Sequence, residues 1–416
     1  MKIKALIQSD KFYVLADQVV VSAGAFLSNL LLARALGINE YGRFASVGLI
    51  QLFALSLFMA TGSQVYQVVY PGLNKERKSD YTSGLFYCLL IMIVAASLFF
   101  TGIFLMRLEW LRNYEDMAAW SIMSIGLYLL QDFLRKALIT SSKEKQAFYS
   151  DSITNLLQLA SLFILWKWDI LNSVNAWIVI GITFIPSIAA AVFWLKISWP
   201  KKNDLLLTMI LHRGKSSWLL LSAFLQWCSG YFFVLAAGWW ISAAALGALR
   251  LSQYIFGLLN VLLQAIENYT LPRLVQSVDK PAYLRQLLKQ LSMLMFPLLA
   301  TISLFADKIL WLAGGESYRG YEYVIYGLTI VYVLITVGYP VRMAIRATHM
   351  NKQFFNGYVL SVVFSVGSAA LLIRNWELYG VIIGLIGTQI INVGYWLFVL
   401  KGQFQHKLFN RKKLSS

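Results

Sequence analysis

Long apolar runs separated by short polar segments make up most of this chain. A helix needs roughly 20 apolar residues to cross a hydrocarbon core about 30 Å thick, and twelve runs are long enough or nearly so. We place the runs near residues 13-36, 45-71, 84-106, 118-139, 150-168, 175-196, 216-239, 244-271, 288-312, 322-345, 355-373 and 379-400. The pattern predicts an all-α integral membrane protein with about 12 transmembrane helices.

The positive residues alternate between the two sides of this arrangement. Every segment on the side of the termini carries at least three Lys or Arg residues, and no loop on the other side carries more than two. Cytoplasmic loops of membrane proteins are enriched in these residues. We therefore expect a multi-pass protein with both termini in the cytoplasm.

A weak repeat relates the two halves of the chain. Arg135-Lys136-Ala137 and the following Lys145-Gln146 recur 207 residues later as Arg342-Met343-Ala344 and Lys352-Gln353. With six helices in each half, both halves enter from the cytoplasm, which predicts two six-helix bundles related by a pseudo-two-fold axis along the membrane normal. Chance similarity between apolar sequences is the alternative, although the matched residues are polar.

The repeat divides the chain into three parts. We expect an N-terminal six-helix bundle at 1-196, a cytoplasmic linker at 197-215 and a C-terminal six-helix bundle at 216-416. The linker holds an apolar stretch between basic clusters, which is typical of a helix that lies in the membrane interface.

Several predicted spans contain residues that are costly in lipid. One face of the eighth span carries Arg250, Gln253, Asn260, Gln264 and Glu267 at helical spacing. Arg250 and Glu267 lie roughly 25 Å apart at about 1.5 Å per residue, so each needs a partner elsewhere. Ionisable residues within spans usually face a cavity or one another, which makes this face a candidate site.

Other candidates lie in the first, fourth and tenth spans. Asp17 lies in the first span, and Asp132 and Arg135 lie at the cytoplasmic end of the fourth. Arg342 and Arg346 are i and i+4 neighbours at the cytoplasmic end of the tenth. Alternatively, the arginine side chains extend to the membrane surface. The amide side chains would then only form hydrogen bonds between helices.

Composition excludes several classes of protein. The chain is 59% hydrophobic and 13% charged, with a mean hydropathy of +0.63. In such a chain the net charge of +17 reflects loops facing anionic lipid, so we expect no nucleic-acid partner. The two cysteines and three histidines have no metal-binding spacing, and there is no Gly-rich Gly-Lys-Ser/Thr loop for ATP, so we expect no metal and no cofactor.

The segment Leu31–Phe44, LLARALGINEYGRF, resembles the first loop of the bacterial polysaccharide flippases. These proteins export lipid-linked oligosaccharides of the O-antigen and capsule type. They belong to the multidrug, oligosaccharidyl-lipid and polysaccharide exporter superfamily. The arginine, Leu-Gly and Tyr-Gly of this segment are the recurrent positions, and Leu271–Leu274 and Leu378–Val381 also resemble family motifs.

The resemblance implies a flippase of the bacterial cytoplasmic membrane. It would carry an undecaprenyl-pyrophosphate-linked oligosaccharide to the outer leaflet by alternating access through a cationic central cavity. The resemblance also implies a polysaccharide polymerase or other export machinery as a partner, beside the membrane lipids. Arginine suits phosphate oxygens, so the cavity candidates are Arg135, Arg250, Arg342 and Arg346. The candidates for the polar lining or for ion coupling are Asp17, Asp132, Gln253, Asn260, Gln264 and Glu267.

Three other functions are alternatives to a flippase. An ion-coupled exporter of small molecules or drugs would have the same fold, with a narrower and more acidic cavity. A membrane glycan-processing enzyme typically holds its catalytic residues in a large outer loop, and the outer loops here are short, so we expect no enzyme. A scaffold would not need charged residues within its spans.

Overall fold

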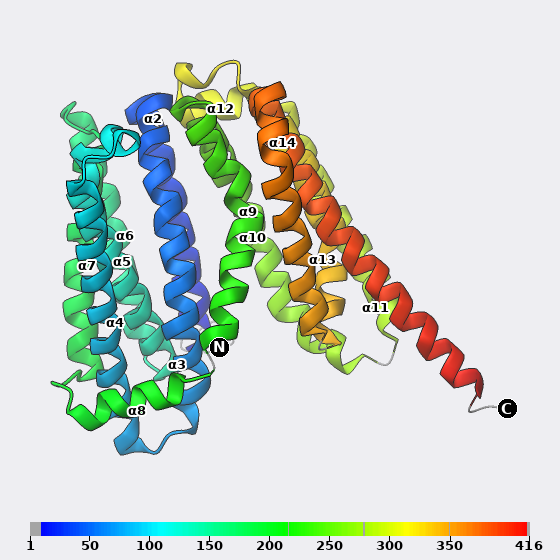
Figure 1. Cartoon of the computed structure of the whole chain (residues 1–416), viewed down its shortest axis with the longest axis horizontal. Coiled ribbons are helices and arrows are strands. Elements are labelled where there is room, and N and C mark those ends of the chain that lie inside the picture. Colours follow the sequence, from blue (N-terminus) through cyan, green and yellow to red (C-terminus); the bar gives the residue numbers. More distant parts are fainter. Residues whose placement is uncertain (1–9, 215, 278, 349, 414–416) are drawn as a thin grey trace, which may run out of the picture. The chain divides into compact units, whose positions relative to one another are not determined.

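The computed structural model describes residues 10–413, apart from 215, 278 and 349. Every regular element in this part of the chain is a helix (Figure 1). In the first half these are α2 (Asp10–Phe58), the π-helix η1 (Met59–Ser63), α3 (Gln64–Val69), η2 (Tyr70–Gly72), α4 (Lys75–Leu105), η3 (Glu109–Tyr114), α5 (Glu115–Thr140), α6 (Glu144–Lys167), α7 (Ser173–Leu195) and α8 (Lys202–His212). The second half has α9 (Ser216–Trp240), α10 (Ala243–Gln276), α11 (Lys280–Leu304), α12 (Ala306–Gly314), η4 (Glu316–Tyr318), α13 (Glu322–Ala347) and α14 (Asn351–Lys413).

In the described part of the chain, the long helices are sufficient for twelve membrane crossings. Within the described residues, nine helical segments are long and apolar enough to span a bilayer. Two of them contain a residue with non-helical backbone angles, Gly37 in α2 and Glu377 in α14, and each supplies two spans. The less apolar α6, with 24 residues, is also long enough. The predicted all-α membrane fold of about twelve helices is therefore confirmed.

The ninth predicted span ends earlier than the sequence pattern indicated. The expected span at 288-312 is divided between α11, which ends at Leu304, and the short α12. Phe305 separates them with φ −109° and ψ 22°, outside helical geometry. Asp307 and Lys308 then make α12 amphipathic, so the apolar residues after the break belong to a separate short helix.

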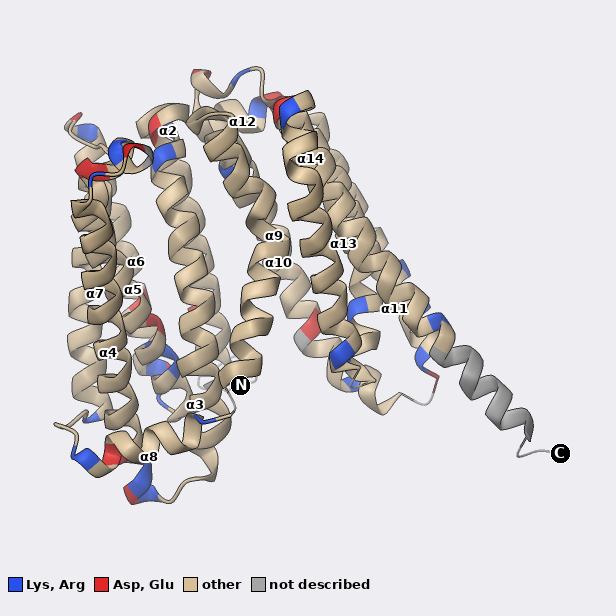
Figure 2. Cartoon of the chain, viewed as in Figure 1, with Lys and Arg blue, Asp and Glu red and all other residues tan. Residues whose placement is uncertain are grey.

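The chain forms two compact units. Unit 1 comprises the chain up to Leu36 together with Arg43–Phe224, and unit 2 comprises Gly37–Gly42 together with Leu225–Ser416. Both units carry their Lys, Arg, Asp and Glu residues mainly towards helix ends, as Figure 2 shows. The few charged residues away from the ends are therefore the ones that need a chemical explanation.

The repeat seen in the sequence extends to helix boundaries. Both α5 and α13 have 26 residues, and α13 begins and ends 207 positions after α5. The start of α14 follows the start of α6 by the same interval. Matching boundaries are unexpected from chance similarity of apolar sequences, so they favour a true repeat.

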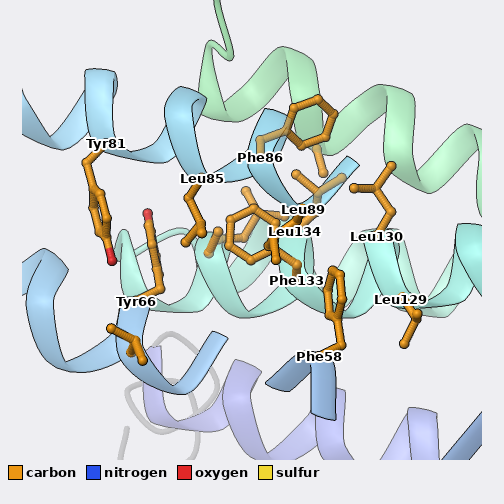
Figure 3. Packing of buried hydrophobic residues seen from close by; sticks show 14 of the residues in the cluster. Phe58, Tyr66, Tyr81, Leu85, Phe86, Leu89, Leu129, Leu130, Phe133 and Leu134 are labelled. Atoms are coloured by element: carbon orange, nitrogen blue, oxygen red, sulfur yellow. The ribbon is translucent and has the colours of Figure 1, made fainter. Parts of the chain in front are cut away.

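Unit 1 has an aromatic and aliphatic core where α3, α4 and α5 meet (Figure 3). Tyr66 stacks on Tyr81 with ring centroids 5.4 Å apart and meets the edge of Phe133 at 5.6 Å. All three side chains are fully buried. Lipid is as apolar as leucine, so close packing of this kind, rather than escape from solvent, stabilises helix association here.

The linker helix α8 packs on α4. Its His212 contacts Tyr81 Oη through Nε2 and the Thr61 carbonyl oxygen through Nδ1, both at 2.8 Å. Gly84 of α4 lies against α8, with no room for a side chain. Leu206, Met209 and Ile210 stay exposed, as in a helix that lies at a membrane surface.

Residues 37–42 fit closely against α10 within unit 2. Gly37 has φ 71°, a conformation that glycine adopts without strain. A Cβ on Gly42 would lie 1.8 Å from the Ala243 carbonyl oxygen, and one on Gly247 would lie 2.4 Å from that of Ile38. The backbone angle of Gly37 and the close backbone contact of Gly42 therefore explain why the Leu-Gly and Tyr-Gly pairs of the first loop contain glycine.

Candidate functional site

Unit 1 contains a buried ion cluster formed by α2, α5 and α6. Arg135 Nη2 lies 2.6 Å from Asp17 Oδ2, and Arg135 Nε lies 2.7 Å from Asp151 Oδ2. Gln131 Nε2 donates to Asp151 Oδ1 at 2.5 Å. Both aspartate side chains are 1% exposed and Arg135 is 16% exposed. With both carboxylates ionised, the three ionisable residues carry one net negative charge.

Asp132, the next residue after Gln131 on α5, forms a separate pair. Lys136 Nζ lies 2.7 Å from Asp132 Oδ2, one helical turn away, and both side chains are largely buried. This pair is neutral, so it leaves the net charge of the cluster unchanged.

Unit 2 contains an ion cluster of opposite net charge, formed by α10 and α13. Arg342 Nη2 lies 2.7 Å from Glu267 Oε2, and Arg346 pairs with Glu267 Oε1. Tyr339 Oη donates to Glu267 Oε2 at 2.6 Å and lies 2.9 Å from the Leu263 carbonyl oxygen. Two guanidinium groups share one carboxylate, so the cluster carries one net positive charge. The arginines are 33% and 42% exposed, whereas Glu267 is 10% exposed.

Arg250 has a different environment, near the start of α10. It is 4% exposed and donates to Gln253 Oε1 at 2.9 Å and to Tyr254 Oη at 3.1 Å. Its guanidinium lies over the rings of Tyr254 and Tyr231, at 4.8 and 5.8 Å from the centroids. Among the salt bridges of the described residues, none involves Arg250. Aromatic faces therefore stabilise this buried charge.

A cavity of about 310 Å³ lies beside the positive cluster, wholly within unit 2. Its wall comes from α9, α10, α13 and α14 and is formed by Gln226, Ser229, Gly230, Asn260, Leu263, Gln264, Ile335, Gly338, Tyr339, Arg342, Tyr358, Gln389, Asn392, Val393 and Trp396. Asn260 also donates to Tyr332 Oη at 2.8 Å. The cavity therefore combines polar amides, aromatic rings and one arginine.

In the structure, the site residues predicted from the sequence lie in several separate sites. Arg342, Asn260 and Gln264 line the cavity, and Glu267 and Arg346 belong to the adjacent ion cluster. Asp17 and Arg135 meet in unit 1, where Asp132 forms its own pair. Arg250 and Gln253 contact each other near the start of α10 and do not line the cavity.

Sequence reasoning missed several residues of these sites, among them Asp151, Asn392 and Trp396. Asp151 lies in the predicted fifth span, so an inventory of ionisable residues within spans would have found it. Asn392 and Trp396 lie four residues apart on α14, on one helix face. Without a charged residue beside them, this pair gave no signal in the sequence.

These sites offer little for a metal ion. Among the described residues, no group of three or more His, Cys, Asp or Glu side chains could hold one. The two aspartates of unit 1 already share Arg135. The side chains of these sites suit the binding of charged and polar groups.

Comparison with known proteins identifies the fold. The structure matches the lipid II flippase MurJ in an inward closed conformation with a TM-score of 0.72 and 13% identity, over 94% of this chain and 87% of that one. It matches an inward-facing multidrug resistance transporter of the MATE family with a TM-score of 0.65 and 16% identity, over 97% and 96%. A superfamily transporter from Pyrococcus furiosus gives a TM-score of 0.58 and 14% identity, over 95% and 97%.

The chain therefore has the fold of the superfamily that includes MurJ and the MATE transporters. No protein-family model and no curated protein matches the sequence. At these identities the likeness defines a multi-pass membrane protein of transporter fold. The substrate has to be argued from the residues of this chain.

Proposed function

We propose that this protein is a flippase for an undecaprenyl-pyrophosphate-linked oligosaccharide in a bacterial cytoplasmic membrane. The lipid would move from the cytoplasmic to the outer leaflet by alternating access, with no chemical change to the substrate. Both chain termini would lie in the cytoplasm, and a polysaccharide polymerase would use the product. The observation that carries the proposal is the net positive cluster of Arg342, Arg346 and Glu267 beside a polar cavity.

The chemistry of the substrate supports this assignment. A pyrophosphate in a membrane of low dielectric constant requires a positive partner. Arg342 and Arg346 are partly exposed and share a single carboxylate, so they keep hydrogen-bonding capacity for phosphate oxygens. Arg135 is held between two aspartates and is the weaker candidate for phosphate.

The acidic cluster of unit 1 supports a role in energy coupling. The cluster of Asp17, Arg135 and Asp151 has one more carboxylate than it has cations, so it would bind a proton. Such binding would couple an ion gradient to transport. The same feature favours the second candidate function, an ion-coupled exporter of cationic small molecules.

The test is a gene deletion in the native host with measurement of lipid-linked oligosaccharide in each membrane leaflet. We expect accumulation in the inner leaflet, rescue by the wild-type gene and failure of Arg342→Gln combined with Arg346→Gln. The matched control is Arg319→Gln, which removes an exposed arginine whose partner is Glu316. An unchanged leaflet distribution together with loss of resistance to cationic drugs would contradict the flippase proposal and favour the exporter.

A further inference from the structure

The linker helix α8 leaves one of its faces uncovered. In Figure 1 it lies crosswise to α4 at the end of unit 1, which is the direction of a helix in the plane of a membrane. Exposed residues follow one another at steps of 4, 3 and 4 positions, as on one side of a helix: Lys202, Leu206, Met209 and Arg213. This face has a cation at each end and an apolar centre, to which the exposed Ile210 belongs.

The opposite face of α8 is fixed to α4. A Cβ on Gly84 would lie 2.7 Å from the Asp204 carbonyl oxygen, so the two helices are in close contact there. Thr208, on the same side of α8, is 2% exposed. At the end of the helix, His212 Nε2 lies 2.8 Å from Tyr81 Oη. The uncovered face is therefore held in one direction and needs no folding to bind a partner.

The charges of the linker match an anionic partner. The segment 197-215 carries four Lys or Arg residues and one acidic residue, Asp204. The Lys201 backbone N–H donates to Asp204 Oδ2 at 2.8 Å, so this carboxylate is used in capping α8. Among the salt bridges of the described residues, none involves Lys202 or Arg213. Both cations therefore keep their hydrogen-bond donors for an external anion.

A second pair of cations lies where the linker leaves α7. Lys196 follows the last residue of α7, and Lys143, between α5 and α6, donates through Nζ to the Trp194 carbonyl oxygen. Burial and the nearby charge of Lys196 lower the pKa of Lys143. A bound anion would relieve the repulsion between the two lysines. Positive charge therefore precedes α8 as well as flanking its apolar centre.

An exposed tryptophan indicates the depth at which α8 lies. Trp199 precedes α8, is 84% exposed and meets the edge of Tyr87 with ring centroids 5.0 Å apart. Tryptophan is enriched at the membrane–water interface, at the level of the headgroups. An amphipathic helix at this level places its apolar side chains at the acyl boundary and its cations beside the lipid phosphates.

We propose that the uncovered face of α8 binds anionic phospholipids, those of the cytoplasmic leaflet in the orientation proposed above. Leu206, Met209 and Ile210 enter the acyl boundary, and Lys202 and Arg213 bind headgroup phosphates. A zwitterionic headgroup binds more weakly, because its ammonium group offsets the charge of the phosphate. A free phosphate ion would leave the apolar centre uncovered. The inference concerns the linker and does not depend on what the protein transports.

The test uses the purified full-length protein in nanodiscs of phosphatidylcholine, with and without phosphatidylglycerol of the same acyl chains. Hydrogen–deuterium exchange of the α8 amides should be slower when phosphatidylglycerol is present. Native mass spectrometry then compares the Kd values of the two lipids. Each Lys or Arg near an anionic surface contributes about a 5-fold difference in Kd, so Lys202→Gln combined with Arg213→Gln should reduce the preference for phosphatidylglycerol by about 30-fold.

Controls separate lipid recognition from total charge and from ion binding. Arg285→Gln combined with Lys289→Gln removes two exposed cations from α11 in unit 2, and exchange in α8 should keep its dependence on phosphatidylglycerol. Leu206→Gln combined with Met209→Gln should weaken the binding of both lipids. Inorganic phosphate added to phosphatidylcholine nanodiscs should leave exchange in α8 unchanged.

Several results would overturn the inference. One is equal exchange of α8 in the two lipid compositions, and another is an unchanged lipid preference after loss of Lys202 and Arg213. Loss of the lipid dependence in the α11 variant would show an effect of total charge, and protection of α8 by inorganic phosphate would show an ion site. These results leave the proposed flippase function intact, because that function is tested by the leaflet measurement.

Discussion

Removal of Arg135 should expose how strongly the buried cluster of unit 1 depends on pairing. The variant Arg135→Met keeps an unbranched side chain but removes the guanidinium group between Asp17 and Asp151. Each aspartate side chain is 1% exposed, so each would keep a buried charge without its cation. Losing one partner of a buried ion pair costs about 3–5 kcal/mol, because the remaining charge is left uncompensated.

A shift in the midpoint of thermal unfolding measures this loss. For domains of about 150–250 residues, 1 kcal/mol lowers Tm by about 2–4 °C, so Arg135→Met should lower it by about 6–20 °C. The triple variant with Asp17→Asn and Asp151→Asn as well removes every charge of the cluster. It should recover most of the stability, since the cost comes from unpaired charge.

The matched control is an ion pair that lies nearer the surface of unit 1. Arg43 Nη2 lies 2.8 Å from Asp116 Oδ1, and these side chains are 27% and 50% exposed. Such pairs contribute about 0–1 kcal/mol, so Arg43→Met should lower Tm by at most about 4 °C. Equal shifts for Arg135→Met and Arg43→Met, or no recovery in the triple variant, would refute the reasoning.

Three further predictions concern other elements. Gly42→Val should abolish folded protein in size-exclusion chromatography, because its Cβ would lie 1.8 Å from the Ala243 carbonyl oxygen; a monodisperse variant would contradict this. Glu267→Gln should raise affinity for undecaprenyl pyrophosphate several-fold in native mass spectrometry, since the competing carboxylate is lost; weaker binding would contradict it. His212→Ala should speed trypsin cleavage within 197-215, because α8 loses its contact with Tyr81; unchanged cleavage would count against it.

The sequence was informative wherever a physical rule acts on one helix at a time. Bilayer thickness sets helix length, so the number of spans and most of their boundaries could be predicted. The separation of Arg250 and Glu267 along α10 showed that they could not pair, and the structure gives each its own partners. The split at Phe305 was missed because α12 continues the apolar composition of α11.

The composition of the sites was harder to predict, because it depends on which helices pack together. Arg135 and Arg342 were both chosen as positive residues, yet their partners lie on other helices, far away in the sequence. Asn392 and Trp396 are ordinary residues of an apolar helix until packing leaves their polar atoms buried and unpaired. Pattern within a single span cannot reveal such pairings.

Corresponding positions of the two halves carry ion clusters of opposite net charge. Arg135 and Arg342 occupy corresponding positions of α5 and α13. The counterpart of Asp151 is Tyr358, which lines the cavity of unit 2. Arg135 therefore pairs with two carboxylates in unit 1, whereas its counterpart Arg342 in unit 2 shares one carboxylate with Arg346. Under the proposed function, the excess of negative charge in unit 1 would suit a coupling proton and the excess of positive charge in unit 2 would suit a phosphate.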